Sequence, residues 1–315
     1  MRDLYIASCT PDGGVYHYKM NKDGEVFFEN KTDLDKPMFL AKENDTLYVL
    51  QKEIFEDGTS GLVSFTINED GELGKMSDVA STKGLVACHL CVENGVVYAV
   101  NYSSGSVIKM PETLKTHEGK GPNEIRQEKA HTHYVGITPD NKYVCVTDLG
   151  LDTIFFYDRD LNLKFTVKVP LGHGARHLVF SSDGKIMYCA NELESTVSVF
   201  RYDGENTKLL NTYKTLPDDF SGKNLAAAIR IHDGYLYISN RGYDGVTSFK
   251  INGEELELAG YTKVGEHPRD INIFDDVLVS TNMLDNTVTF YRLSEGKLTK
   301  YNTLEGIKEP LCVIG

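Results

Sequence analysis

The most regular feature of the chain is a hairpin pattern, in which two apolar stretches flank a short polar turn. One example runs from Leu178-Val179-Phe180 through Ser181-Ser182-Asp183-Gly184 to Tyr188-Cys189-Ala190. Alternating or continuous apolar runs of this length, joined by an Asp-Gly turn, predict two antiparallel strands. Arg176 opens the first strand and Glu192 closes the second, so the turn is expected to bring this cation and this carboxylate close together.

The same pattern recurs seven times along the chain. Each unit holds an apolar strand, a polar turn, a second strand, a short polar stretch and a third strand that begins with Val or Ile. The seven third strands begin at Val15, Val63, Val107, Ile154, Val197, Val246 and Val288, which lie 42 to 49 residues apart. That spacing is typical of the four-stranded blades of a β-propeller. The sequence therefore predicts an all-β, seven-bladed β-propeller as one domain over residues 1–315.

The turns and the longest polar segment agree with this fold. The first hairpin turns contain Asn, Asp or Gly, which tolerate the positive φ that such turns require, at 43–45, 93–95, 139–141, 182–184 and 232–234. Helical periodicity is almost absent. The stretch from Thr113 to Lys129 is polar, contains Pro122 and is the longest segment without a strand pattern, so we expect it to be a surface loop.

The two ends of the chain predict how the ring closes. Residues 309–314 resemble the first strands of the other units but have no hairpin partner after them, whereas residues 3–8 resemble second strands and have no first strand before them. We expect the C-terminal strand to become the inner strand of the N-terminal blade. This arrangement would close the ring and leave no terminal blade exposed.

Composition narrows the choice of partners. The chain holds 18 Tyr, 14 Phe and 28 Gly but no Trp, and its formal net charge is −13. An acidic chain without a basic face is not expected to bind nucleic acid. No apolar run approaches the roughly 18 residues of a membrane span, and no signal peptide is recognised, so a cytoplasmic location is expected.

Among six cysteines, Cys88 and Cys91 form a C-x-x-C pair, but residues three apart on a strand face opposite ways and chelate a metal poorly.

Propeller geometry predicts which residues meet at one end of the central channel, which we call the mouth. The starts of the first strands and the ends of the second strands converge there. The first strands supply Met38, His89, His133, Arg176, Ala227 with Ala228, Arg269 and Leu311; the second strands supply Gln51, Asn101, Asp148, Glu192, Arg241 and Asn282. Three arginines against two carboxylates leave positive charge for an anionic small molecule, because a guanidinium matches carboxylate and phosphate geometry. The alternative is that these charges only pair off as salt bridges between blades.

At these residues the chain resembles the lactonase family of seven-bladed propellers, which includes the propeller-type 6-phosphogluconolactonases and the fungal carboxy-muconate lactonizing enzymes. The matching segments cover nearly the whole chain and include 88–89, 101–102, 148–150, 174–177, 191–193, 240–244 and 267–269. By similarity to the muconate-cyclizing members, the resemblance implies a catalytic set of His133, Arg176, Glu192 and Arg241. Ala228 departs from the family, many of whose members carry Glu at this point.

The resemblance and the cationic mouth favour a hydrolase that acts on a sugar lactone or a phosphorylated sugar lactone. Either His133 or Glu192 could serve as the base, and Arg176 and Arg241 could stabilise the oxyanion or hold the acid group of the substrate. Substrate binding is expected to involve His89, Arg269, Asp148, Asn101, Asn282 and Gln51. No cofactor is expected, and no metal, because nearby arginines oppose a divalent cation. The protein is expected to be a monomer or a homodimer.

Two other functions remain open from the sequence. The first is a cycloisomerase of muconate-like or sugar-acid lactones, for which the same base or acid would move a proton at carbon. The second is a non-catalytic propeller that binds a metabolite or a protein partner, since propellers often serve as scaffolds.

Overall fold

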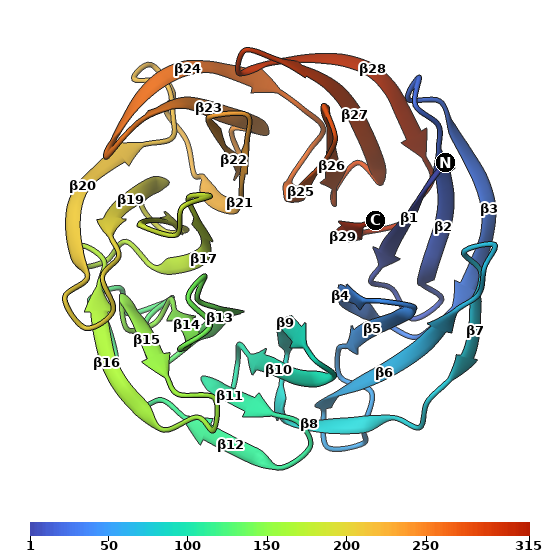
Figure 1. The fold of residues 1–315 in the computed structure, drawn as a ribbon, viewed down its shortest axis with the longest axis horizontal. Coiled ribbons are helices and arrows are strands. Elements are labelled where there is room, and N and C mark those ends of the chain that lie inside the picture. Colours follow the sequence, from blue (N-terminus) through green and yellow to red (C-terminus); the bar gives the residue numbers. More distant parts are fainter.

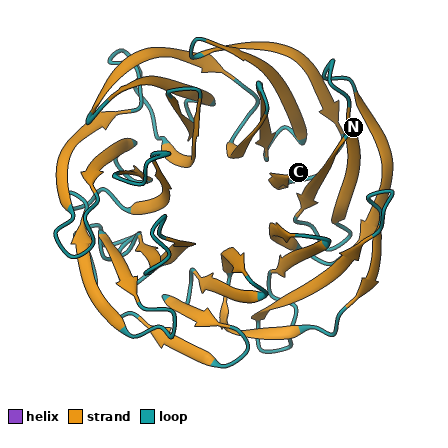
Figure 2. Ribbon diagram, in the orientation of Figure 1, coloured by secondary structure: helices purple, strands orange, loops and turns teal.

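Seven antiparallel β-sheets form a closed ring around a central axis in the computed structural model, which describes residues 1–315 (Figure 1). The chain consists of strands and turns without a helix (Figure 2). The structure therefore has no helix that is long and apolar enough to span a membrane. The predicted all-β, seven-bladed propeller is confirmed.

The strands of each blade follow one another outward from the channel. Blade 1 contains β29 (Pro310–Ile314), β1 (Arg2–Ser8), β2 (Gly14–Met20) and β3 (Val26–Asp33), and blade 2 contains β4 (Pro37–Glu43), β5 (Thr46–Gln51), β6 (Thr59–Ile67) and β7 (Leu73–Met76), with β8 (Ala80–Leu85) also paired to β6. Blade 3 contains β9 (Ala87–Glu93), β10 (Val96–Asn101), β11 (Ser106–Lys109) and β12 (Thr113–Thr116), and blade 4 contains β13 (Thr132–Ile137), β14 (Val144–Asp148), β15 (Thr153–Tyr157) and β16 (Leu163–Lys168).

The remaining blades follow the same order. Blade 5 contains β17 (Ala175–Phe180), β18 (Ile186–Asn191), β19 (Thr196–Arg201) and β20 (Lys208–Lys214), and blade 6 contains β21 (Leu225–His232), β22 (Tyr235–Arg241), β23 (Gly245–Asn252) and β24 (Glu255–Lys263). Blade 7 contains β25 (Pro268–Phe274), β26 (Val277–Asn282), β27 (Thr287–Ser294) and β28 (Lys297–Glu305).

The ring closes in blade 1, where the two ends of the chain meet. Strand β29 pairs antiparallel with β1, so that Tyr5 lies opposite Ile314 and Ala7 opposite Cys312 (Figure 1). The C-terminal strand is thus the inner strand of the N-terminal blade, as the sequence predicts. This pairing satisfies the backbone groups along β1 that would otherwise form an open edge.

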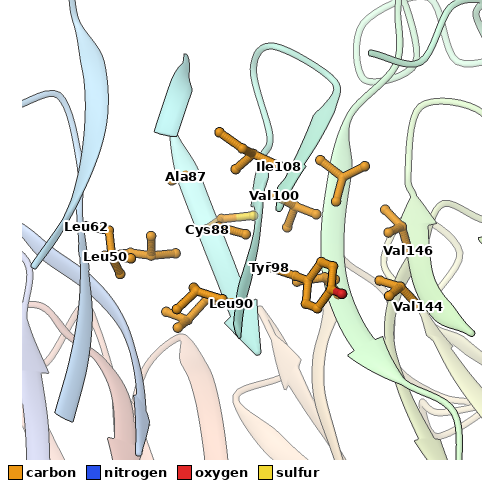
Figure 3. Close-up of a cluster of buried hydrophobic side chains, with 14 of the residues drawn as sticks. Leu50, Leu62, Ala87, Cys88, Leu90, Tyr98, Val100, Ile108, Val144 and Val146 are labelled. Atoms are coloured by element: carbon orange, nitrogen blue, oxygen red, sulfur yellow. The ribbon is translucent and has the colours of Figure 1, made fainter. Parts of the chain in front are cut away.

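The hydrophobic core lies between the faces of neighbouring blades. Its largest cluster joins blades 1 to 4 and includes Leu50, Leu90, Val100 and Val146, each almost completely buried (Figure 3). The inner three strands of a blade are covered on both faces, which explains why their sequences are nearly continuous apolar runs. The outer strands face solvent on one side and carry more polar residues.

The first hairpin turns adopt the backbone conformation that their residues predict. Asn44, Asn94, Asn141 and Asp233 all have a positive φ between 45° and 58°. Side chains of Asn and Asp tolerate this region better than others do.

The polar segment after Thr113 differs from the prediction at its start. Thr113–Thr116 forms β12, the outer strand of blade 3, so only the following residues are a loop. A four-residue strand with three exposed side chains carries no apolar alternation that would reveal it in the sequence.

Candidate active site

A β-bulge at the start of every inner strand aims side chains into the channel. In blade 4, for example, Thr132 pairs with Asp148 and Tyr134 with Thr147, which leaves His133 unpaired between them. A bulge bends the strand and redirects the extra residue. The bulge residues are Met38, Cys88, His133, Arg176, Arg269 and Leu311, with Ala227 and Ala228 in blade 6.

The second strands contribute the residues at or just beyond their last paired position. Six of these residues lie around a single cavity: Cys9, Lys52, Tyr102, Glu192, Arg241 and Met283. Together with the bulge residues they form the wall of the mouth. Both sets come from strand ends that the core holds in place, so the site rests on a rigid frame.

The cavity at the mouth has a volume of about 500 Å³. Its wall includes the predicted site residues His133, Glu192, Arg241 and Arg269. A narrow inner extension, which shares Met38, Cys88, His133, Arg269 and Leu311 with the cavity, also contacts Arg176. The four residues of the expected catalytic set therefore lie together, and Arg269 lies beside them.

Glu192 is the centre of this group. Its Oε2 accepts a hydrogen bond from Nε of Arg176 at 3.0 Å and forms an ion pair with Nη2 of Arg241 at 2.7 Å, and its Oε1 accepts a hydrogen bond from Nη2 of Arg126 at 2.5 Å. Nε2 of His133 lies 3.9 Å from the same Oε2. The ion pair expected between Arg176 and Glu192 thus exists, but as one part of a larger cluster.

The charges of the cluster set the protonation states. Burial alone would raise the pKa of the Glu192 carboxyl, but Arg241, Arg176, His133 and Arg126 outweigh it and hold this pKa well below its usual range. Burial and the neighbouring Arg241 lower the pKa of Arg176 to about 9, which still leaves this guanidinium charged at neutral pH. Glu192 is therefore a carboxylate surrounded by cations.

His133 is held in its neutral form. Burial, and then the positive charge of Arg176, lower its pKa well below the ordinary histidine value. Its Nδ1 lies 4.0 Å from Sγ of Cys88. A neutral imidazole beside a cavity can accept a proton at neutral pH.

Two arginines have donor capacity that the protein itself does not use. Nη1 of Arg176 is buried and has no hydrogen-bond partner within the chain. Arg269 lines both the cavity and its inner extension and takes part in no ion pair. Lys36 and Lys52 lie on the same cavity wall. These cations outnumber the carboxylates available to them, so the cavity is suited to an anion.

His89 lies deeper in the channel than the sequence analysis places it. Because Cys88 is the bulge residue, the next position points below the mouth, where the His89 ring packs 4.3 Å from the Phe39 ring and 4.5 Å from the Tyr134 ring. His177 closes this layer at 5.2 Å from His89. His89 does not line the cavity, and burial is the main cause that lowers its pKa.

Four of the expected substrate-binding residues also lie outside the cavity. Their side chains point into the blades, where Asn101 donates to Ser106, Asn282 donates to Thr287 and Thr289, Gln51 donates to the carbonyl of Asp35, and Asp148 binds His117 at 2.6 Å. On a strand, adjacent residues face opposite sides, so an error of one position moves a side chain from the channel to the blade interior. The positions that do face the cavity in blades 2, 3 and 7 are Lys52, Tyr102 and Met283.

Arg126 is the main site residue that the sequence analysis misses. It lies in the loop between β12 and β13, far along the chain from Glu192, and also donates to the hydroxyl of Tyr102 at 3.2 Å. The loop is not part of the sevenfold repeat, so the repeat pattern gives no position for its side chains. A lone arginine in a polar segment carries no other signal in one sequence.

The fold and the cavity define the class: a seven-bladed β-propeller with a strongly charged small-molecule cavity at one end of its channel. The chain belongs to the lactonase family of seven-bladed β-propellers, whose family model matches residues 3–314. An uncharacterized protein of Staphylococcus aureus strain USA300 is 33% identical over the whole of both chains.

Solved structures agree with this assignment. One from Bacteroides fragilis, described as a “putative 6-phosphogluconolactonase”, has a TM-score of 0.88 and 27% identity and covers 99% of this chain and 97% of its own. Another with the same description, from Bacteroides uniformis, has a TM-score of 0.90 and 26% identity and covers 100% and 99%. The predicted family resemblance is confirmed.

Proposed function

We propose that this protein hydrolyses the lactone of an anionic sugar acid, with 6-phosphogluconolactone as the first substrate to test. The observation that carries the proposal is the neutral His133 beside an arginine-bound Glu192 in one cavity with the unpaired Arg269. Family membership and the description of the two Bacteroides proteins support the substrate class. Lactone hydrolysis needs a base, an oxyanion site and an anchor, and each has a candidate here.

His133 is the base in this proposal. Its imidazole takes a proton from water, whose oxygen attacks the lactone carbonyl carbon to form a tetrahedral intermediate. Glu192 is less suited to this role, because arginines already occupy both of its carboxylate oxygens. Collapse of the intermediate breaks the ring C–O bond, and the imidazolium returns the proton to the departing alkoxide.

The arginines stabilise the charge that develops on the carbonyl oxygen. Nη1 of Arg176 has no partner in the chain, and Arg176 lines the inner extension, so this guanidinium has a free N–H to donate to an oxyanion. Arg241 contributes a second positive charge. Glu192 keeps both guanidinium groups in place and favours the imidazolium that His133 becomes during the reaction.

The acid group of the substrate binds to the cations that have no partner in the chain. Arg269 and Lys36 line the cavity and form no ion pair, so a phosphate or carboxylate would gain their full attraction. Arg269 also lines the inner extension beside His133 and Arg176, so the acid group would bind next to the reacting carbonyl.

The test is a release assay on 6-phosphogluconolactone and unphosphorylated aldonolactones. We expect wild-type turnover well above the spontaneous rate and a loss of roughly 10²- to 10⁴-fold in kcat for His133→Ala. His232→Ala is the matched control and should retain activity, because His232 lies at the turn between β21 and β22, where it pairs with Asp276. The absence of any lactone turnover above the spontaneous rate would overturn the proposal and leave a binding propeller.

A cycloisomerase is the second candidate, because the structure brings together His133, Arg176, Glu192 and Arg241, the set implied by the muconate-cyclizing relatives. Such an enzyme would transfer a proton at carbon. NMR analysis of products formed in D₂O separates the two reactions, since only isomerisation places deuterium on carbon.

A further inference from the structure

The three arginines bound to Glu192 are not equivalent. Side chains of Arg176 and Arg241 are 2% and 4% exposed, whereas that of Arg126 is 32% exposed. Arg176 and Arg241 come from the ends of β17 and β22, and Arg241 also donates to the carbonyl of Ala226 at 3.2 Å. Only Arg126 reaches Glu192 from a loop and from the solvent side.

The backbone that carries Arg126 is firmly held. Gln127 is completely buried and donates to the carbonyl of Leu149 and to Oδ1 of Asp152, both at 2.8 Å. Oδ1 of Asn123 accepts from the backbone N–H of Arg126 at 3.1 Å. The loop therefore fixes the Cα of Arg126, and the part of this residue with freedom to move is its long side chain.

The side chain of Arg126 also has room to move. It lies between the mouth cavity and a second surface cavity of about 650 Å³, and both cavities are lined by Arg126, Arg241 and Leu225. A rotation about its side-chain bonds would change which of the two cavities it occupies.

Arg126 is the partner that Glu192 can most easily lose. Arg176 and Arg241 already compensate the buried carboxylate through Oε2, and Arg126 alone binds Oε1. A partly exposed ion pair is weak compared with a buried one, because solvent screens it. A phosphate or carboxylate in the cavity would offer this guanidinium a second, more highly charged partner.

We propose that Arg126 masks Oε1 of Glu192 in the free protein and turns to the acid group of the bound substrate, so that it selects anionic over neutral lactones. The inference rests on the proposed function and deepens it, since it assigns substrate selection to a loop outside the sevenfold repeat. Binding of the anion frees Oε1 and removes one positive charge from the carboxylate beside His133. An uncharged lactone does not draw Arg126 away from Glu192, so Oε1 stays covered and the positive charge stays beside the carboxylate.

The experiment compares kcat/KM for 6-phosphogluconolactone and for glucono-δ-lactone in the wild type, Arg126→Ala and Arg126→Lys. We expect Arg126→Ala to lower the ratio of the two kcat/KM values roughly 10- to 100-fold, and Arg126→Lys to restore part of it. Lys120→Ala, an exposed cation of the same loop without a contact to the site, should keep the wild-type ratio. An equal change on both lactones would overturn the inference.

A binding measurement separates this inference from the proposed function. If the wild type turns over neither lactone, the proposed function fails, and calorimetry with 6-phosphogluconate then tests Arg126 directly. A loss of tenfold or more in affinity for Arg126→Ala supports its role as an anion ligand, and an unchanged affinity overturns it. Thermal melting of each variant shows that it is folded, and Arg126→Lys provides a second variant if the alanine protein is unstable.

Discussion

At the scale of single residues, Glu192 determines the charge balance of the mouth. Its side chain is 3% exposed and faces three guanidinium groups, so each charge is compensated only while the others remain. Removing one partner from a buried ion pair leaves an uncompensated charge, which costs far more than the pair itself contributes. The cluster therefore couples its members strongly.

We predict that Glu192→Gln lowers the free energy of unfolding by roughly 3–5 kcal/mol, because Arg176 and Arg241 lose their counter-charge. The double variant Glu192→Gln with Arg176→Met should lose less free energy of unfolding than the two single variants together. The second substitution removes one of the uncompensated charges. Urea denaturation of the four proteins measures the coupling. If the two losses of free energy simply add, the charges of the cluster are not coupled, and the prediction is wrong.

We also predict that the protein loses stability as the pH falls from about 7 to 5. Burial lowers the pKa of His89, His133 and His177, so the folded protein keeps these rings neutral where the unfolded chain, with a histidine pKa of about 6.5, binds protons. Because the unfolded chain binds more protons than the folded protein, the free energy of unfolding rises with pH across this window. The melting temperature measured from pH 5 to 7 should follow that slope.

The substitution His89→Phe should reduce the slope, because an aromatic ring that cannot titrate would occupy the space between Phe39 and Tyr134. A slope identical to that of the wild type would contradict the assignment of His89 to this effect.

At the scale of the element, the bulge at the start of each inner strand decides which side chains reach the cavity. The sevenfold repeat, the blade order and the closure of the ring are all predictable, because apolar periodicity and turn residues encode them directly. Which of two neighbours, such as Asn101 and Tyr102, faces the cavity is not predictable. It depends on where the strand ends and on one extra residue in the partner strand. The side chain of Arg126 is unpredictable for another reason: its loop follows no period.

The pair Asn101 and Tyr102 tests this register. Asn101→Ala should lower the free energy of unfolding by roughly 1–3 kcal/mol, because its buried amide donates to Ser106 and to the carbonyl of Thr82, while kcat/KM stays the same. Tyr102→Phe should lower kcat/KM and leave the free energy of unfolding unchanged. It removes the hydroxyl that binds Arg126 but leaves the blade interior intact. Activity lost in the first variant and kept in the second would mean that the faces are exchanged.

At the scale of the whole molecule, closure of the ring depends on one short strand. Strand β29 buries Leu311, Cys312 and Val313, and it also carries Leu311 to the wall of the cavity. Without it, β1 would present an unpaired edge and the cavity would lose part of its wall between blades 7 and 2.

We predict that deletion of residues 310–315 destabilises the protein by about 5 kcal/mol or more, since three buried side chains each contribute about 1.5–3 kcal/mol. That loss is comparable to the whole stability of an ordinary domain. Thermal melting and size-exclusion chromatography should show early unfolding and self-association through β1. Deletion of the exposed Gly315 alone is the control and should leave both measurements unchanged.

The pairing of β29 with β1 also determines when the protein becomes functional during synthesis. Strand β1 leaves the ribosome before the other strands and β29 leaves it after them, so a nascent chain can build blades 2 to 7 in turn but cannot complete the cavity until β29 has emerged. Chains stalled on the ribosome before residue 310 has emerged should therefore be inactive in the lactonase assay, whereas chains in which residues 310–314 have emerged can complete the cavity.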